Sequence, residues 1–218
     1  MNNAQQKIVV FGAAGTIGKA VVAALSPKYQ VLQVGNRRGE FKADLADPDS
    51  ITNVFKAIGK VDGIVSTAGA ARFAPLEKLS DEDFRFSLAN KLMGQVNLAR
   101  IGIDYLNDKG SITLTSGILS HQPMVGSAVI SLVNAGLEGF TRAAALEAPR
   151  GIRVNVVSPP WVTETLKALN MDPSLGKPRS RWRRALLRAS RDNKAARSSK
   201  FSPMGDCDCT RTAKSTTG

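Results

Sequence analysis

Three closely spaced glycines, Gly12, Gly15 and Gly18, form the first pattern in the chain that could do chemistry. They follow the apolar run 8–11 and open a helical pattern. Glycine lets a backbone turn tightly and approach a pyrophosphate, and a helix N-terminus offers N–H groups and a positive dipole end to phosphates. The pattern predicts a dinucleotide-binding turn, with a bare packing turn as the alternative. The expected phosphate-contacting residues are Gly12, Gly15, Thr16, Ile17 and Gly18.

A second chemical signal is the sequence Asn36-Arg37-Arg38, which follows the apolar run 30–34. A site that prefers NAD places a carboxylate here for the ribose 2′-hydroxyl, whereas an arginine suits a 2′-phosphate. The nearest carboxylate is Glu40. The pattern favours NADP, with NAD as the alternative cofactor and a solvated arginine loop as the alternative interpretation.

The elements that must position these residues alternate between short β-branched runs and longer helical patterns. Six strands are expected, at 8–11, 30–34, 41–43, 63–66, 111–114 and 152–157. Helices are expected at 16–26, after Asp47-Pro48, from Ser80 to about Leu106, and near 126–147. This alternation is typical of a doubly wound, Rossmann-type α/β fold, a parallel sheet with helices on both faces.

The motifs and their order resemble the short-chain dehydrogenase/reductase family over residues 7 to about 170. The resemblance implies a cofactor turn at the three glycines and adenine contacts at Asp44 and Leu45. Ala68 and Gly69 match half of the family's Asn-Asn-Ala-Gly, and Ser116 matches the catalytic serine. Residues 155–162 resemble the stretch that passes the nicotinamide, which implies contacts at Pro159 and Val162, with Pro160 in place of glycine.

The family's catalytic tyrosine and lysine are absent from their expected positions. Alignment of residues 134–140 with the family's Lys-Ala-Ala-Leu-Glu-Gly-Phe places Ile130 at the tyrosine and Asn134 at the lysine. Tyr105 and Lys109 have the right spacing, but they precede the serine strand, so a helix C-terminus explains them better.

Lys91 occupies the place of an asparagine that, in the family, holds a water relayed to the catalytic lysine. Because Asn134 stands where that lysine would be, the two residue types have exchanged places. The resemblance implies that the two side chains face each other. One hypothesis is that Lys91 supplies positive charge, and a proton, near Ser116, which requires a pKa lowered by burial. A surface lysine on a divergent helix is the alternative.

His121, the single histidine, follows Ser116 by five residues. Its ordinary pKa makes it an acid/base candidate, although a solvated loop histidine is the simpler interpretation. Ser127 and Ser131 flank the missing tyrosine, but a serine hydroxyl is too weak an acid to replace a phenol, so a packing role is favoured.

The net charge of +12 belongs mostly to the last 42 residues. Residues 1–176 have a surplus of only three positive charges, and residues 177–218 have a surplus of nine and contain neither Ile nor Val. The expected organisation is an NAD(P)-binding domain at 1–176 and a basic, strand-poor tail at 177–218. Three hypotheses for the tail are a frameshifted C-terminus, an arm for nucleic acid or an acidic partner, and a solvated, disordered segment. The absence of interleaved aromatic residues argues against nucleic acid.

Composition excludes several classes of protein. The hydrophobic fraction of 43% argues against disorder along the whole chain. The sequence has neither a membrane-length apolar run nor a signal-peptide pattern, so a cytoplasmic protein is expected. Cys207 and Cys209 have no histidine beside them, so no metal site is expected.

The resulting functional hypothesis is an NADP(H)-dependent oxidoreductase with a degenerate active site, acting on a small-molecule carbonyl/alcohol pair. Ser116 would polarise the carbonyl, and Lys91 and Asn134 would replace the missing pair. The alternative is a non-catalytic dinucleotide-binding protein of the same fold. A homo-oligomer is compatible with either.

Overall fold

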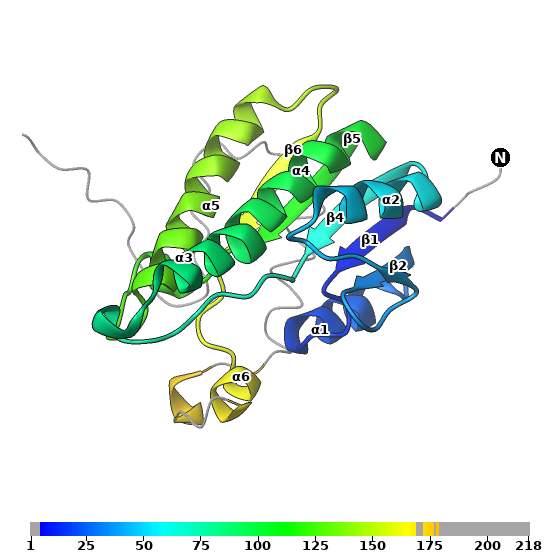
Figure 1. Ribbon diagram of the computed structural model, residues 1–218. Coiled ribbons are helices and arrows are strands. Elements are labelled where there is room, and N and C mark those ends of the chain that lie inside the picture. Colours follow the sequence, from blue (N-terminus) through cyan, green and yellow to red (C-terminus); the bar gives the residue numbers. More distant parts are fainter. Residues whose placement is uncertain (1–4, 169–171, 177, 179–218) are drawn as a thin grey trace, which may run out of the picture.

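The computed structural model describes residues 5–168, 172–176 and 178, and these form a six-stranded parallel sheet (Figure 1). The strand order is β3-β2-β1-β4-β5-β6. This is the doubly wound Rossmann topology that the sequence predicts, in which the order reverses between β1 and β4. The strands are β1 (Lys7–Phe11), β2 (Gln30–Gly35), β3 (Phe41–Lys42), β4 (Val61–Ser66), β5 (Leu106–Thr115) and β6 (Arg153–Val157).

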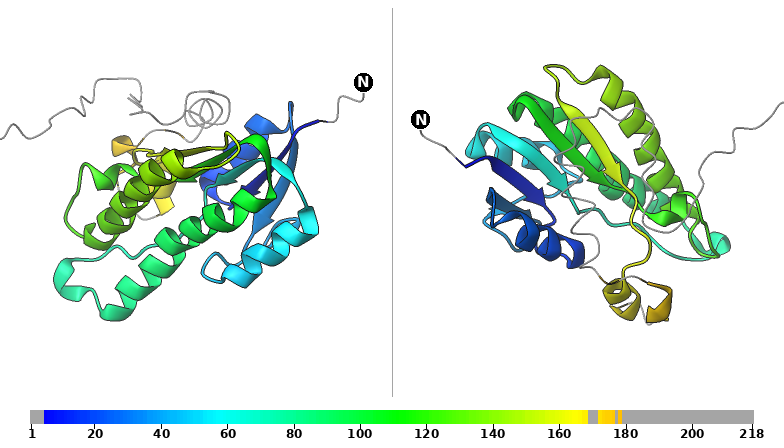
Figure 2. Two further views of the ribbon diagram at one scale, coloured as in Figure 1. Left: turned by 90° about the horizontal axis from the view of Figure 1, so that it is seen from above. Right: turned by 180° about the vertical axis from the view of Figure 1, so that it is seen from behind.

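Helices cover both faces of the sheet, as Figure 2 shows from above and behind. One apolar core lies between the sheet and the face covered by α2, α4 and α5, and includes Phe55, Leu98 and Leu137. A smaller core joins α1 to the opposite face through Val21 and Leu25. The helices are α1 (Thr16–Leu25), α2 (Pro48–Ile58), α3 (Asp81–Ser87), α4 (Gly94–Tyr105), α5 (Ala128–Glu147) and α6 (Thr163–Ala168).

Local sequence explains where the helices begin. The Asp47 carboxylate accepts the N–H of Asp49 at 3.0 Å, and Pro48 occupies the first turn of α2. Ser80 and Asp83 form a reciprocal capping box at the start of α3. Both helix starts confirm the sequence prediction.

The long helix expected from Ser80 to about Leu106 is continuous but not regular. A π-helical segment, Leu88–Met93, lies between α3 and α4. Such segments frequently occur at functional sites. This one contains Lys91, which places that residue in the one irregular stretch of the long helix.

The fifth strand is longer than the sequence predicts. β5 begins at Leu106 instead of residue 111, because Leu106 pairs with Val61 ahead of an irregularity in the ladder. The stretch 107–110, Asn-Asp-Lys-Gly, lacks β-branched residues, so its own sequence gives no sign of a strand.

The described part of the chain also contains three 3₁₀ turns, at Leu76–Lys78, Ile118–Ser120 and Pro173–Leu175. Within the described residues, no helix is long and apolar enough to cross a membrane, and no group of three or more potential ligands is placed to hold a metal ion. The hypotheses on the tail 177–218 fall almost entirely outside the described residues.

Candidate active site

The glycine turn packs against the end of the neighbouring strand. Gly12 adopts φ +80°, and a Cβ atom there would lie 2.8 Å from the backbone nitrogen of Ala68. A Cβ on Gly18 would overlap the carbonyl oxygen of Gly12. At Gly15 the nearest atom to a Cβ would be that same oxygen, at 3.2 Å. The close packing of the turn therefore requires glycine at positions 12 and 18. Position 15 has more space around a Cβ atom.

Thr67 fixes this turn, a role that the sequence analysis missed. Its hydroxyl lies 3.1 Å from the carbonyl oxygen of Phe11 and 3.2 Å from that of Gly12, and can donate to either. Its backbone N–H also donates to Phe11. The sequence did contain a signal for this role: Thr67 stands directly before Ala68-Gly69, where the family has an asparagine.

The N-terminus of α1 can accept an anion. Gly15 caps the helix without a side-chain hydrogen bond, and the first turn contains no acidic residue. The N–H groups of that turn are therefore not satisfied by a capping side chain, and they retain the positive end of the helix dipole.

The loop after β2 exposes the three residues predicted to select the cofactor. Asn36, Arg37 and Arg38 are all exposed. Farther on, the Asp44 carboxylate accepts the Ala46 N–H at 2.9 Å. Leu45 is buried and packs against Gly94, where a Cβ would lie 2.9 Å from that of Leu45.

Ser116 lies just beyond the carboxyl end of β5, one strand away from β4. Its backbone N–H donates to Val157, and the N–H of Ile118 donates to Pro159, both at 2.9 Å. Ser116 and Val162 are both buried. These contacts join the chain around the predicted serine to β6 and to the stretch that follows it.

Glu138 on α5 joins this site, although the sequence analysis gave it no role. Its Oε1 accepts from Ser116 Oγ at 2.5 Å and from Ser120 Oγ at 2.7 Å, and its Oε2 lies 2.7 Å from His121 Nε2. His121 is therefore not simply a solvated loop residue. Helical spacing could have revealed Glu138, since Asn134, Leu137, Glu138 and Thr141 lie on one buried face of α5.

Lys91 lies beside the same strand end. Its Nζ donates to the carbonyl oxygen of Thr115 at 3.2 Å, and burial lowers its pKa to about 8. Its stem packs on Gly69, where a Cβ would lie 3.1 Å from the Lys91 Cα. The buried Gln95 amide also accepts from and donates to the Thr115 backbone, at 2.9 Å each.

Asn134 is buried on α5, close to the chain that leaves Ser116. A Cβ on Gly117 would lie 2.9 Å from the Asn134 Nδ2. The Asn134 Oδ1 has no hydrogen-bond partner among the described residues. No hydrogen bond of the described residues joins Asn134 to Lys91, and the facing arrangement of the two side chains stays a prediction.

The remaining candidates from the sequence lie apart from this site or have packing contacts. Tyr105 stacks on Phe55 at 5.1 Å between ring centroids, at the amino end of β5, and Lys109 follows within that strand. Ser127 Oγ lies 2.7 Å from the carbonyl oxygen of Met124 and 3.1 Å from Ser131 Oγ.

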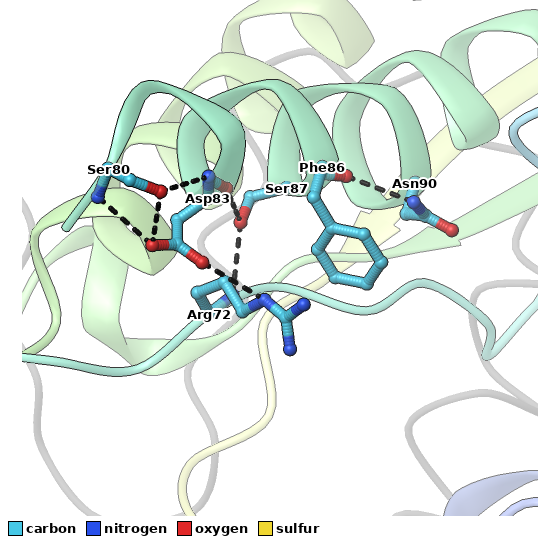
Figure 3. Close-up of polar contacts among 6 residues, drawn as sticks. All are labelled: Arg72, Ser80, Asp83, Phe86, Ser87 and Asn90. Carbon is cyan, nitrogen blue, oxygen red and sulfur yellow. Dashed lines mark hydrogen bonds and ion pairs between the residues drawn. The ribbon is translucent and has the colours of Figure 1, made fainter.

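A polar network anchors the segment after β4 to α3 (Figure 3). Arg72 Nε lies 3.2 Å from the Asp83 carboxylate, and its guanidinium lies over the Phe86 ring at 4.4 Å. Hydrogen bonds from the Ser80 backbone and hydroxyl lower the pKa of Asp83, with a smaller contribution from Arg72. The Arg72 N–H donates to Ser87 Oγ at 3.0 Å. The network attaches the segment after β4 to α3. Gly69, in the same segment, packs against Lys91.

Comparison with curated proteins gives a consistent result. A family model described as enoyl-(acyl carrier protein) reductase matches residues 4–186. Carbonyl reductase family member 4 of Xenopus laevis is 29% identical over 189 residues, covering 77% of this chain and 80% of that protein. The 3-oxoacyl-[acyl-carrier-protein] reductase of Bos taurus is 30% identical over 184 residues, covering 74% and 78%.

Solved structures agree with the curated relatives. A crystal structure of a Listeria innocua protein is 39% identical, with a TM-score of 0.84, and the match covers 87% of this chain and 96% of that one. A small-chain dehydrogenase crystallised with NADPH is 27% identical, with a TM-score of 0.77, covering 87% and 92%. The chain belongs to the short-chain dehydrogenase/reductase family.

Proposed function

We propose that the chain is an NADP(H)-dependent oxidoreductase that interconverts a small-molecule carbonyl and its alcohol. The observation on which this depends is the position of the glycine turn and Ser116 at the same end of the sheet, the carboxyl ends of its strands. The turn follows β1, Ser116 follows β5, and β4 lies between them. Ligands of open α/β sheets bind at the carboxyl ends of strands beside the point where strand order reverses.

The residues present fit a dinucleotide. The uncapped N-terminus of α1 provides N–H groups for a pyrophosphate, and Gly15 permits a close approach. We assign adenine contacts to Asp44 and Leu45 and contacts near the nicotinamide to Pro159 and Val162. When bound, the nicotinamide supplies or accepts the hydride.

Arg37 and Arg38 support NADP over NAD. Both are exposed beside the turn, where a guanidinium can form charge-assisted hydrogen bonds with a 2′-phosphate. The relative crystallised with NADPH lends further support. Asn36 adds an uncharged donor at the same loop.

Lys91 and Asn134 would together replace the missing tyrosine and lysine. The Lys91 ammonium, which is buried beside the end of β5 and has a pKa of about 8, can supply positive charge near Ser116. The buried Asn134 Oδ1 is an acceptor with no partner among the described residues, at the position where the family's lysine contacts the nicotinamide ribose. A ribose hydroxyl would satisfy it.

The first test is a titration with NADPH and NADH, followed by nicotinamide fluorescence. NADPH should bind at least about tenfold more tightly than NADH, because a hydrogen bond to a charged group contributes about 1.5–3 kcal/mol. The double variant Arg37→Ala/Arg38→Ala should abolish that preference, while Lys56→Ala, an exposed charge on α2, should retain it. Equal binding of both nucleotides would contradict the NADP assignment.

A non-catalytic dinucleotide-binding protein is the second candidate, and Ile130 is the observation that favours it. This half-buried aliphatic side chain stands at the tyrosine position and cannot donate a proton. A panel of carbonyl and alcohol substrates separates the two candidates. Turnover by the wild type that falls in Lys91→Met supports the enzyme, whereas tight NADPH binding without any turnover supports the alternative.

A further inference from the structure

Hydrogen-bond donors from three side chains converge on the Glu138 carboxylate. Glu138 is buried, and both of its carboxylate oxygens have partners. Ser116 donates to Oε1, and His121 Nε2 contacts Oε2. Ser120 Oγ lies 2.7 Å from Oε1 and 3.0 Å from the carbonyl oxygen of Gly117, and can donate to either. A buried carboxylate is costly unless it is paired and hydrogen-bonded, so these contacts allow it to be buried beside Ser116.

The hydrogen bonds of Ser116 fix the direction in which its hydroxyl points. A serine hydroxyl has one proton and two lone pairs. The proton is directed to Glu138 Oε1, and one lone pair accepts the N–H of Gly117. The remaining lone pair can accept a hydrogen bond from a substrate, but the proton is not free to polarise a carbonyl oxygen.

We infer that Glu138 is the positioning residue that makes Ser116 a proton acceptor, so that the site binds an alcohol and oxidises it. This inference rests on the proposed function. The substrate O–H proton passes to Ser116 Oγ as Ser116 passes its own proton to Glu138 Oε1. A bound oxidised nicotinamide would take the hydride from the carbon, and the C–O bond would become a carbonyl. In the reverse reaction the proton would return along the same path, from Glu138 Oε1 through Ser116 Oγ to the substrate oxygen.

His121 connects this carboxylate to solvent. Its side chain is 49% exposed, whereas that of Glu138 is 8% exposed. The imidazole therefore lies between the buried carboxylate and water, and it contacts the oxygen that Ser116 does not. The Ser120 hydroxyl can add a second hydrogen bond to Oε1.

The variant Glu138→Gln tests the inference, because it preserves shape and hydrogen bonding but removes the base. For an alcohol that the wild type oxidises, kcat should fall by about 100-fold or more, a typical contribution of general base catalysis. KM, NADP⁺ affinity and Tm should change little. Glu147→Gln, an exposed carboxylate on the same helix, is the matched control and should behave as the wild type.

A double-mutant cycle separates a proton path from a merely structural contact. If Ser116 and Glu138 act as one unit, Ser116→Ala/Glu138→Gln should be no slower than the worse single variant. Glu138→Asp, which retains a carboxylate, should recover part of the lost kcat.

Three results would overturn the inference. One is a Glu138→Gln kcat within threefold of the wild type. Another is a loss of kcat that comes together with a loss of NADP⁺ binding and of Tm. A wild type that binds the cofactor and oxidises or reduces nothing would overturn the proposed function, and this inference with it. In the first two cases the wild type is active, so the proposed function survives.

Discussion

Lys91 differs from an ordinary surface lysine because of the atoms that surround it. Its stem packs on Gly69, its Nζ donates to Thr115, and desolvation lowers its pKa from 10.5 to about 8. A charged ammonium is therefore less stable in the folded protein than in the unfolded chain. The lowered pKa of Lys91 therefore means that its charged form destabilises the fold at neutral pH.

The stability of the protein should depend on pH through this residue. Between pH 8 and 10.5 the unfolded chain binds the Lys91 proton more tightly than the folded protein, so this contribution to stability rises as pH rises. Each unit of pKa shift corresponds to about 1.4 kcal/mol. Urea unfolding should show that the free energy of unfolding of the wild type increases between pH 7 and pH 9.5. The increase should be smaller in Lys91→Met.

Lys56→Met is the control for that measurement, since Lys56 is exposed. Its pH dependence should match that of the wild type. Parallel pH profiles for the wild type and Lys91→Met would show that Lys91 titrates alike in the folded and unfolded protein, against the prediction.

At the scale of elements, the turn between β1 and α1 combines two different uses of glycine. Gly18 permits close packing of the helix on the turn, since a Cβ there would overlap Gly12. Gly15 has φ −74°, which any residue can adopt, and a tight but not overlapping contact. We therefore expect the missing side chain of Gly15 to affect cofactor binding more than the stability of the fold.

A pair of alanine variants should separate these two uses. Gly18→Ala should lower the free energy of unfolding by about 1–3 kcal/mol, a typical cost of overpacking. Gly15→Ala should leave stability nearly unchanged and weaken NADPH binding by at least about tenfold. Thermal unfolding and fluorescence titration measure the two effects, and equal loss of stability in both variants would contradict the distinction.

Sequence could predict those elements whose signals are local. The β-branched runs, the Asp47-Pro48 start and the Ser80/Asp83 capping box depend on neighbours within a few residues. The π-helical segment could not be predicted, because it forms where the long helix contacts other parts of the fold. The contact between Ser116 and Glu138 joins residues 22 positions apart, so only the folded sheet and α5 bring them together.

At the scale of the molecule, the proposed cofactor site is formed by two groups of elements. The turn depends on β1, α1 and β4, and the candidate catalytic residues depend on β5, α5 and the long helix. A dinucleotide that contacts both groups should bind the folded state and not the unfolded one, and binding of that kind raises stability.

NADPH should therefore raise the melting temperature of the full chain. At 100 times the Kd the expected stabilisation is about 2.7 kcal/mol. For a protein of this size that corresponds to a rise of roughly 5–10 °C. Differential scanning fluorimetry with NADPH, with NADH and without nucleotide measures this rise, and an unchanged melting temperature at saturating NADPH would contradict the proposed cofactor.

The contact between His121 and Glu138 gives the site a natural spectroscopic probe. His121 is the only histidine in the chain, and it lies at hydrogen-bonding distance from the carboxylate that contacts Ser116. The two imidazole C–H proton resonances in an NMR spectrum must therefore belong to His121, and no assignment experiment is needed. Its response to added nucleotide or alcohol reports directly on events at Ser116, before any substrate of the protein has been identified.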